Sequence, residues 1–164
     1  NIKYEYATEY VQWAVPVDQD GNPTADFSVS EVFMTPAEEK SDASLSIVSY
    51  RVFNGSELAT LYPSDFKVAK GYAVVELIVK PSESAVKWWS YIALDDLTSY
   101  PEQTIIKNIL QAPTDEGMTR QLIVSFWGTN TIMGVAQDAN GKYGPLLLEV
   151  VQLDKNNVTP ASEL

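Results

Sequence analysis

The sequence predicts an all-β sandwich, and two observations support this fold class. Runs of alternating apolar and polar residues recur between clusters of turn residues, a pattern typical of strands that bury one face. In addition, the segment "QWAVPVDQDGNP" at 12–23 returns in similar form as "IMGVAQDANGKYGP" at 132–145. A repeat with a spacing of about 120 residues suits two sandwich modules in series better than a solenoid.

The repeat sets the predicted domain boundaries. Residues 2–21 align with residues 122–141 without a gap, and both copies close with an Asp-x-[Asp/Asn]-Gly turn between two β-rich runs. We therefore expect a partial module at 1–37 that holds strands E, F and G. A complete module with a short C-terminal tail is expected at 38–164.

The complete module is predicted to contain strands A, B and C, a helix, and strands E, F and G. Alternating runs at 43–53, 71–80 and 86–94 predict strands A, B and C. The period then changes at 99–110, where Pro101 falls in the first turn and four apolar residues form one stripe. This pattern predicts a short helical insertion between strands C and E. The repeated segment then supplies strands E, F and G.

A family resemblance extends this prediction. The segment "TEYVQWAVPVDQDGNPTADFSVSEVFMTP" resembles the last two strands of a fibronectin type III domain, with Thr8 and Tyr10 opening strand F. The hairpin and the helix resemble divergent fibronectin type III-like repeats from surface lipoproteins of anaerobic gut Gram-negative bacteria. The resemblance implies an immunoglobulin-like sandwich. It also implies a location either at the cell surface, as an extracellular segment of an outer-membrane lipoprotein, or in the periplasm. Predicted strand B departs from the family because it lacks the usual tryptophan.

Composition excludes several functions. The net charge of −11 and only 11 Lys and Arg residues make nucleic acid a poor partner. No run is long and uncharged enough to insert into a membrane. With neither cysteine nor histidine, the chain has no disulfide, no Ser-His-Asp triad and no ordinary zinc site, and we expect no cofactor. The opening residues 1–6 are predicted to form a strand, so the chain is expected to be a mature segment.

Residues 1–37 lack the strands that would complete a module, and three strands with an uncovered apolar face are not stable alone. We prefer the hypothesis that they are the end of a truncated preceding repeat. Two alternatives are a strand-exchanged homo-oligomer with another copy of the chain, and packing onto the second module as one larger sandwich.

The first turn has a weak resemblance to a calcium loop. Asp18, Asp20 and Asn22 have the one-three-five spacing of EF-hand ligands, but Val29 stands where the loop needs a bidentate Glu. We therefore prefer a structural role, in which Asp and Asn side chains and Gly21 turn the chain between strands F and G.

Adjacent tryptophans on strand C suggest a binding surface. Because side chains alternate, Trp88 is predicted to face the core, and Trp89 and Tyr91 to face outward. With Gly134 outward on neighbouring strand F, they would form a shallow aromatic shelf for a sugar ring or an extended peptide; the alternative is packing under the helix or a neighbouring domain. Trp13 is expected in the core. The strand F residues predicted to face the core are Thr131, Met133 and Val135. In the preceding strand E, Leu122, Val124 and Phe126 are predicted to face the core, and Trp127 to face outward on the opposite sheet.

Catalysis is not expected. The carboxylate pairs Asp95–Asp96, Asp115–Glu116 and Glu38–Glu39 fall in predicted loops or linkers, where acidic residues solvate the surface. The expected function is a non-catalytic spacer or adhesion module of a bacterial cell-surface or secreted protein, with a glycan or another surface protein as possible partner. The alternative is a carbohydrate-binding module or an accessory domain of a secreted glycan-degrading enzyme.

Overall fold

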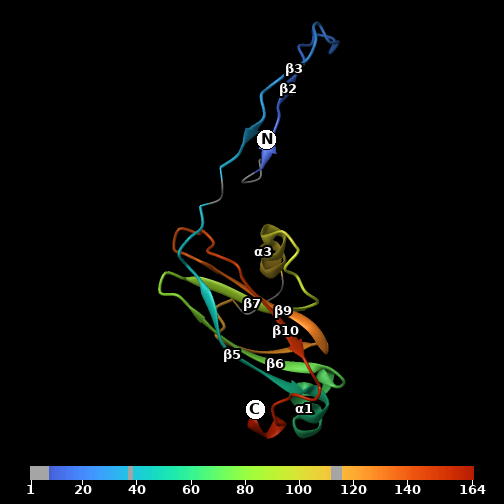
Figure 1. Cartoon of the computed structure of the whole chain (residues 1–164), viewed down its shortest axis with the longest axis vertical. Coiled ribbons are helices and arrows are strands. Elements are labelled where there is room, and N and C mark those ends of the chain that lie inside the picture. The colour runs from blue at the N-terminus through green and yellow to red at the C-terminus, as the bar shows by residue number, and fades with distance from the viewer. Residues whose placement is uncertain (1–7, 37–38, 112–115) are drawn as a thin grey trace. The chain divides into compact units, whose positions relative to one another are not determined.

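The computed structural model describes residues 8–36, 39–111 and 116–164 (Figure 1). The chain divides into two compact units, an N-terminal unit at Asn1–Glu39 and a C-terminal unit at Lys40–Leu164. The described residues are mostly β, in agreement with the predicted all-β class.

The N-terminal unit contains one antiparallel hairpin. Strand β1 pairs with β4, and β2 pairs with β3, so the two short ladders lie along the same pair of chain segments. An isolated bridge between Val17 and Pro23 continues the pairing toward the turn. The strands are β1 (Glu9–Tyr10), β2 (Trp13–Ala14), β3 (Ser28–Val29) and β4 (Phe33–Met34).

The C-terminal unit contains two three-stranded antiparallel sheets, ordered β5-β6-β8 and β10-β9-β7. Each strand lies close to a run that the alternating pattern predicted. Their bounds are β5 (Leu45–Asn54), β6 (Ala73–Pro81), β7 (Lys87–Leu94), β8 (Arg120–Ser125), β9 (Gly128–Gln137) and β10 (Leu147–Leu153).

Side chains from both sheets form a shared core. Burying these apolar side chains provides the main stabilisation of the unit, about 1.5–3 kcal/mol for each large one relative to the exposed state. A buried hydrogen bond of 2.8 Å from Gln121 Nε2 to Ser90 Oγ also joins β8 to β7. The buried members of this inter-sheet core are Leu45, Val52, Ala73, Val75, Leu77, Val79, Ile92, Ile132, Val151 and Leu153.

A helical segment that the sequence analysis did not predict joins β5 to β6. It comprises α1 (Gly55–Leu61), α2 (Pro63–Phe66) and η1 (Lys67–Ala69). Asn54 caps α1, because its side chain accepts a hydrogen bond of 2.9 Å from the backbone N–H of Ser56. Leu58 then packs on Phe53, so this segment covers the outer face of the first sheet.

Helix α3 (Glu102–Gln111) lies between β7 and β8 in the chain and packs on the outer face of the second sheet. Its buried residues Ile105 and Ile109 contact the cluster that contains Met133 and Val135. Among the described residues, no helix is long and apolar enough to cross a membrane.

The C-terminal tail returns to the first strand of the unit. Thr159 bridges Phe53 in parallel orientation, and its N–H donates a 2.7 Å hydrogen bond to the Val52 carbonyl. After η2 (Ala161–Glu163), Leu164 packs against the cluster beneath α1. The tail therefore fixes the end of the chain to β5.

Candidate binding surface

The aromatic residues of β7 lie on the faces that the sequence predicts. Trp88 packs against the inter-sheet core, which confirms its inward prediction. Trp89 lies on the opposite face but is partly buried, because it packs in the cluster under α3 with its ring 6.3 Å from that of Tyr143. Tyr91 is 37% exposed on the same face. The helix thus covers much of the predicted shelf.

Gly134 does not lie beside these two aromatic residues, so its predicted outward orientation was wrong. It pairs with Ser90, which lies between Trp89 and Tyr91 in β7 and therefore faces the opposite side of the sheet. A Cβ atom added at Gly134 would lie 2.7 Å from Cδ2 of Leu45, a member of the inter-sheet core. The structure therefore brings Trp89 and Tyr91 together but places Gly134 between the sheets.

The orientation of β9 was wrong by one residue along the whole strand. Met133 pairs with Tyr91 and Val135 with Trp89, so both lie on the outer face under α3, while Ile132 joins the inter-sheet core. A shift of one residue reverses every side chain of a strand. Thr131 through Ala136 are all buried, so no polar face marked the outward side.

The strand β8 was also predicted with the wrong side inward. Leu122, Val124 and Phe126 had been expected in the core, but they are 42%, 43% and 54% exposed. Phe126 packs edge to face on Tyr72, with ring centroids 5.2 Å apart. Trp127, predicted outward, instead packs against the inter-sheet core. Leu122, Val124 and Phe126 thus form an exposed apolar strip along edge strand β8 and the residue that follows it.

The calcium-like turn is held by its own hydrogen bonds. One carboxylate oxygen of Asp18 accepts from the backbone N–H of Asp20 at 2.9 Å and of Asn22 at 2.8 Å. The hydrogen bond from Asn22 is the main reason that the pKa of Asp18 lies below its ordinary value. Gly21 has a φ of +84°, a conformation that favours glycine. These contacts agree with the structural role that the sequence analysis preferred.

The second copy of this turn has the same geometry. Asp138 accepts from the backbone N–H of Asn140 at 2.8 Å and of Lys142 at 2.9 Å, and Gly141 has a φ of +79°. The pKa of Asp138 is lowered first by the Lys142 hydrogen bond. Among the residues that the structure describes, no group of three or more His, Cys, Asp or Glu side chains could hold a metal.

Of the three carboxylate pairs, Asp95–Asp96 lies wholly within the described residues, and both members make hydrogen bonds within the fold. Asp95 adopts a φ of +73°, and its carbonyl accepts a 2.7 Å hydrogen bond from Thr131 Oγ1. The Asp96 carboxylate accepts from both the hydroxyl and the N–H of Thr98, which lowers its pKa. Asp115 and Glu38 lie outside the described residues, so neither of the remaining pairs is described in full.

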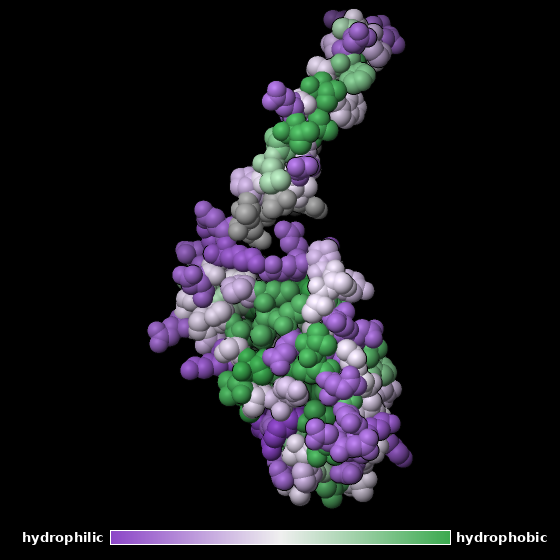
Figure 2. All heavy atoms as spheres, in the orientation of Figure 1, coloured by the Kyte–Doolittle hydropathy of each residue, from purple (hydrophilic) through white to green (hydrophobic). Residues whose placement is uncertain are grey.

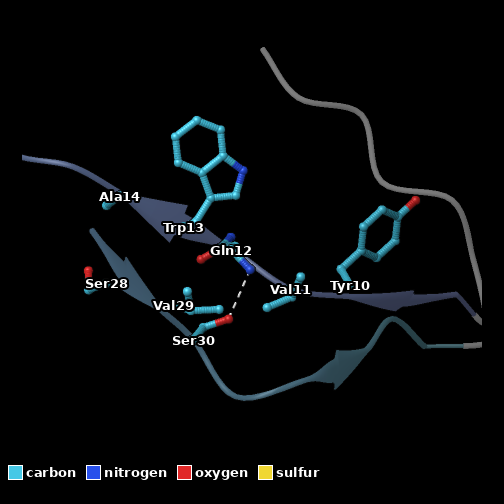
Figure 3. Close-up of a pocket in the computed structure, with 8 residues that line it drawn as sticks. All are labelled: Tyr10, Val11, Gln12, Trp13, Ala14, Ser28, Val29 and Ser30. Carbon is cyan, nitrogen blue, oxygen red and sulfur yellow. Dashed lines mark hydrogen bonds between the residues drawn. The ribbon is translucent and has the colours of Figure 1, made fainter. Parts of the chain in front are cut away.

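Trp13 is exposed, contrary to its predicted place in the core. Its side chain is 72% exposed and projects from the hairpin backbone (Figure 3). Among the described residues, β2 pairs with β3 alone. Trp13, Val15, Phe27 and Val29, which we term the hairpin apolar face, line a common depression. Figure 2 shows apolar residues along this unit.

A second, larger depression runs along the same hairpin beside Trp13. It is open to solvent, and the N–H of Gln12 donates a 2.9 Å hydrogen bond to Ser30 Oγ within it (Figure 3). Its lining residues are Tyr10, Val11, Gln12, Trp13, Ala14, Ser28, Val29 and Ser30.

The structure also reveals a buried ionic cluster that the sequence analysis missed. Glu76 is 2% exposed and accepts from Arg51 Nε at 2.6 Å and Arg120 Nε at 2.7 Å. Arg51 is the larger cause of the lowered pKa of Glu76. The available signal was a single Glu inside the apolar run "AVVELIV" of β6. Both carboxylate oxygens of Glu76 are thus paired with a guanidinium group.

Comparison of the chain with protein-family models, with curated protein sequences and with solved structures found no match in any of the three.

Proposed function

We propose that the C-terminal unit is an immunoglobulin-like module of fibronectin type III character. The orders β5-β6-β8 and β10-β9-β7 support this, since they correspond to A-B-E and G-F-C in such a module. Its role is that of a non-catalytic spacer or adhesion segment of a bacterial cell-surface or secreted protein, extracellular or periplasmic. Helix α3 would then be the insertion between strands C and E.

The observation that carries the spacer role is the position of the two ends of the C-terminal unit. The unit begins at Lys40, whose Nζ lies 2.7 Å from the Glu102 carboxylate at the start of α3. It ends at Leu164, in the cluster beneath α1. Within this unit α3 and α1 lie at opposite ends (Figure 1). The first and last residues of the unit thus lie at opposite ends of it, which is the geometry that a spacer needs.

The contact between the tail and β5 adds resistance to tension. Thr159 lies parallel to β5, so pulling on the two ends of the unit shears this pairing. This isolated bridge, together with the 3.2 Å hydrogen bond from Arg51 Nη1 to the Glu163 carbonyl, is then loaded along the strand direction. The unit should therefore remain folded under a moderate pulling force, as a spacer at a surface must.

Single-molecule force spectroscopy tests this proposal on the full chain. The absence of native cysteine allows handles at Ser41→Cys and Glu163→Cys. We expect one discrete unfolding event that releases about 40 nm of chain, at about 3.6 Å per extended residue. Thr159→Pro removes the N–H donated to Val52 and should lower the unfolding force, while Glu149→Gln on exposed β10 should not. Gradual extension without a discrete event would refute the spacer proposal.

Carbohydrate binding is the second candidate, favoured by the exposed rings of Trp13 and Tyr91. Tryptophan fluorescence should be titrated against a glycan panel with Trp13→Ala and Trp89→Ala beside the parent chain. Saturable quenching that either variant abolishes would replace the spacer proposal with a carbohydrate-binding module. No response in the folded chain would leave the spacer proposal in place.

A further inference from the structure

The two hairpins of the chain share a hydrogen-bond pattern at a constant spacing. In the N-terminal unit the N–H of Asp18 donates to the Asn22 carbonyl at 2.9 Å, and that of Thr24 to the Pro16 carbonyl at 2.9 Å. In the C-terminal unit the N–H of Asp138 donates to the Lys142 carbonyl, and that of Gly144 to the Ala136 carbonyl, each at 3.0 Å. Each hydrogen bond of the first hairpin thus has a counterpart in the second, between residues whose numbers are higher by 120. The backbone groups of the first hairpin's leading segment that bond to its own returning segment therefore match the groups of β9 and Asp138 that bond toward β10.

The opposite edge of β9 shows what this kind of hairpin pairs with. Val135 pairs with Trp89 of β7 and Met133 pairs with Tyr91, while the Gln137 carbonyl accepts a 2.8 Å hydrogen bond from the N–H of Val86. Residues of β9 thus alternate between bonding β10 and bonding β7, as in any antiparallel ladder.

Within residues 8–36 of the N-terminal unit, no neighbour corresponding to β7 is found along the matching outer edge. Trp13, Val15 and Val17 occupy the positions of Met133, Val135 and Gln137, so their backbone groups point away from β3. Among the described residues, no strand pairs along this edge. An edge of this kind is a template for strand addition.

The side chains on this edge also lack the cover that their counterparts have. Met133 is 4% exposed and Val135 is fully buried, whereas Trp13 is 72% exposed. The difference arises because β7 and α3 cover β9. A strand added beside β2 would bury part of the hairpin apolar face.

Charge indicates what kind of strand fits. Residues 8–36 carry five carboxylates and no Lys or Arg, so a second copy of this hairpin would meet like charge. In β7 the residue opposite Gln137 is Lys87. By the same register a cation would lie opposite Val17, next to Asp18, and an aromatic residue would lie opposite Trp13.

We propose that the Trp13–Val17 edge accepts an extended segment of another polypeptide as an antiparallel strand. The segment alternates bulky apolar residues in the manner of β7 and carries Lys or Arg at the end that lies nearest Asp18. This inference concerns the N-terminal unit alone and does not depend on the spacer role, which the C-terminal unit carries.

The probe is a synthetic peptide with the sequence of 86–94, followed by two lysines for solubility. It is titrated into the full, ¹⁵N-labelled chain. We expect saturable shifts of the Trp13, Val15 and Val17 amides and slower hydrogen exchange of the outward N–H groups. Shifts confined to the C-terminal unit would mean that the peptide displaces native β7, and would overturn the proposal.

Two variants separate strand pairing from general apolar adhesion. Val15→Pro removes an outward N–H without removing apolar surface, and Trp13→Asp removes the main apolar contact; each should weaken binding at least about tenfold. Phe126→Asp, at another exposed aromatic residue directly after edge strand β8, should leave binding unchanged. A peptide with Lys87→Glu should bind about threefold more weakly, because it brings a carboxylate next to Asp18.

Three results would overturn the proposal. The first is undiminished binding by Val15→Pro, which would mean adhesion without backbone pairing. The second is a concentration-dependent shift of the same amides without peptide, which would assign the edge to a second copy of the chain. The third is quenching of Trp13 by a glycan together with no response to the peptide.

Discussion

Replacing Glu76 with Gln tests the buried ionic cluster of the first sheet. The substitution keeps the size of the side chain but removes its charge. Arg51 and Arg120 then keep their positive charges on a face where the carboxylate, only 2% exposed, had offset part of that charge. We expect a loss of stability in the C-terminal unit.

The magnitude follows from the contacts of Glu76. A hydrogen bond to a charged group contributes about 1.5–3 kcal/mol, and Glu76 makes such bonds with both arginines. Removing one partner of a fully buried pair costs about 3–5 kcal/mol. Here the arginine side chains are 37% and 57% exposed and retain water, which reduces the loss. We expect about 2 kcal/mol, or a lowering of Tm by roughly 8 °C.

The effect depends on pH in a defined direction. Arg51 and Arg120 lower the pKa of Glu76 in the folded state, so the charge of Glu76 stabilises the fold above the unfolded pKa of about 4.3. This contribution disappears as the pH falls through the folded pKa. The difference between parent and Glu76→Gln should therefore be full at pH 7 and shrink toward pH 3 and below.

Urea unfolding of both proteins at several pH values measures this difference. Glu149→Gln is the matched control, since it makes the same chemical change at an exposed position of β10 and should shift the free energy of unfolding by less than about 0.5 kcal/mol. The reasoning fails if Glu76→Gln is as stable as this control, or if its effect is the same at pH 3 as at pH 7.

Further predictions concern single positions. Gly134→Ala places a methyl group 2.7 Å from Leu45 Cδ2 and should destabilise the C-terminal unit by about 1–3 kcal/mol in thermal unfolding; parent-like stability would contradict the inward placement. Gly141→Ala, at a φ of +79°, should cost about 1–2 kcal/mol, whereas Gly21→Ala should leave the midpoint of the C-terminal unit unchanged. Trp13→Phe should remove the tryptophan emission that acrylamide quenches most; an unchanged quenching constant would show that Trp13 is covered.

Strand positions and turns were predictable because their signals are local. Alternation over a few residues placed β5, β6 and β7 to within a few residues, and the Asp-x-[Asp/Asn]-Gly motif indicated both hairpin turns. Such turns are formed by hydrogen bonds between a side chain and backbone groups only two to four residues away, as at Asp18.

The helical segment after β5 was missed although it has a recognisable start. Asn54 precedes Ser56 and Glu57 at an N-cap position, and Leu58 begins an apolar face. The helix is only seven residues long, and a helix of that length is not stable in isolation. Its existence depends on Phe53 and Val74 beneath it, which are distant contacts in the folded unit.

The sequence alone determined where strands and turns occur, because alternation and turn chemistry act between near neighbours. The folded structure decided which face of β8 and β9 is buried, since that depends on what covers each face. In β9 one face packs on the opposite sheet and the other under α3, so Met133 and Ile132 are equally buried on opposite sides. Trp13, in the matching strand of the N-terminal unit, has no such cover from residues 8–36 and is 72% exposed.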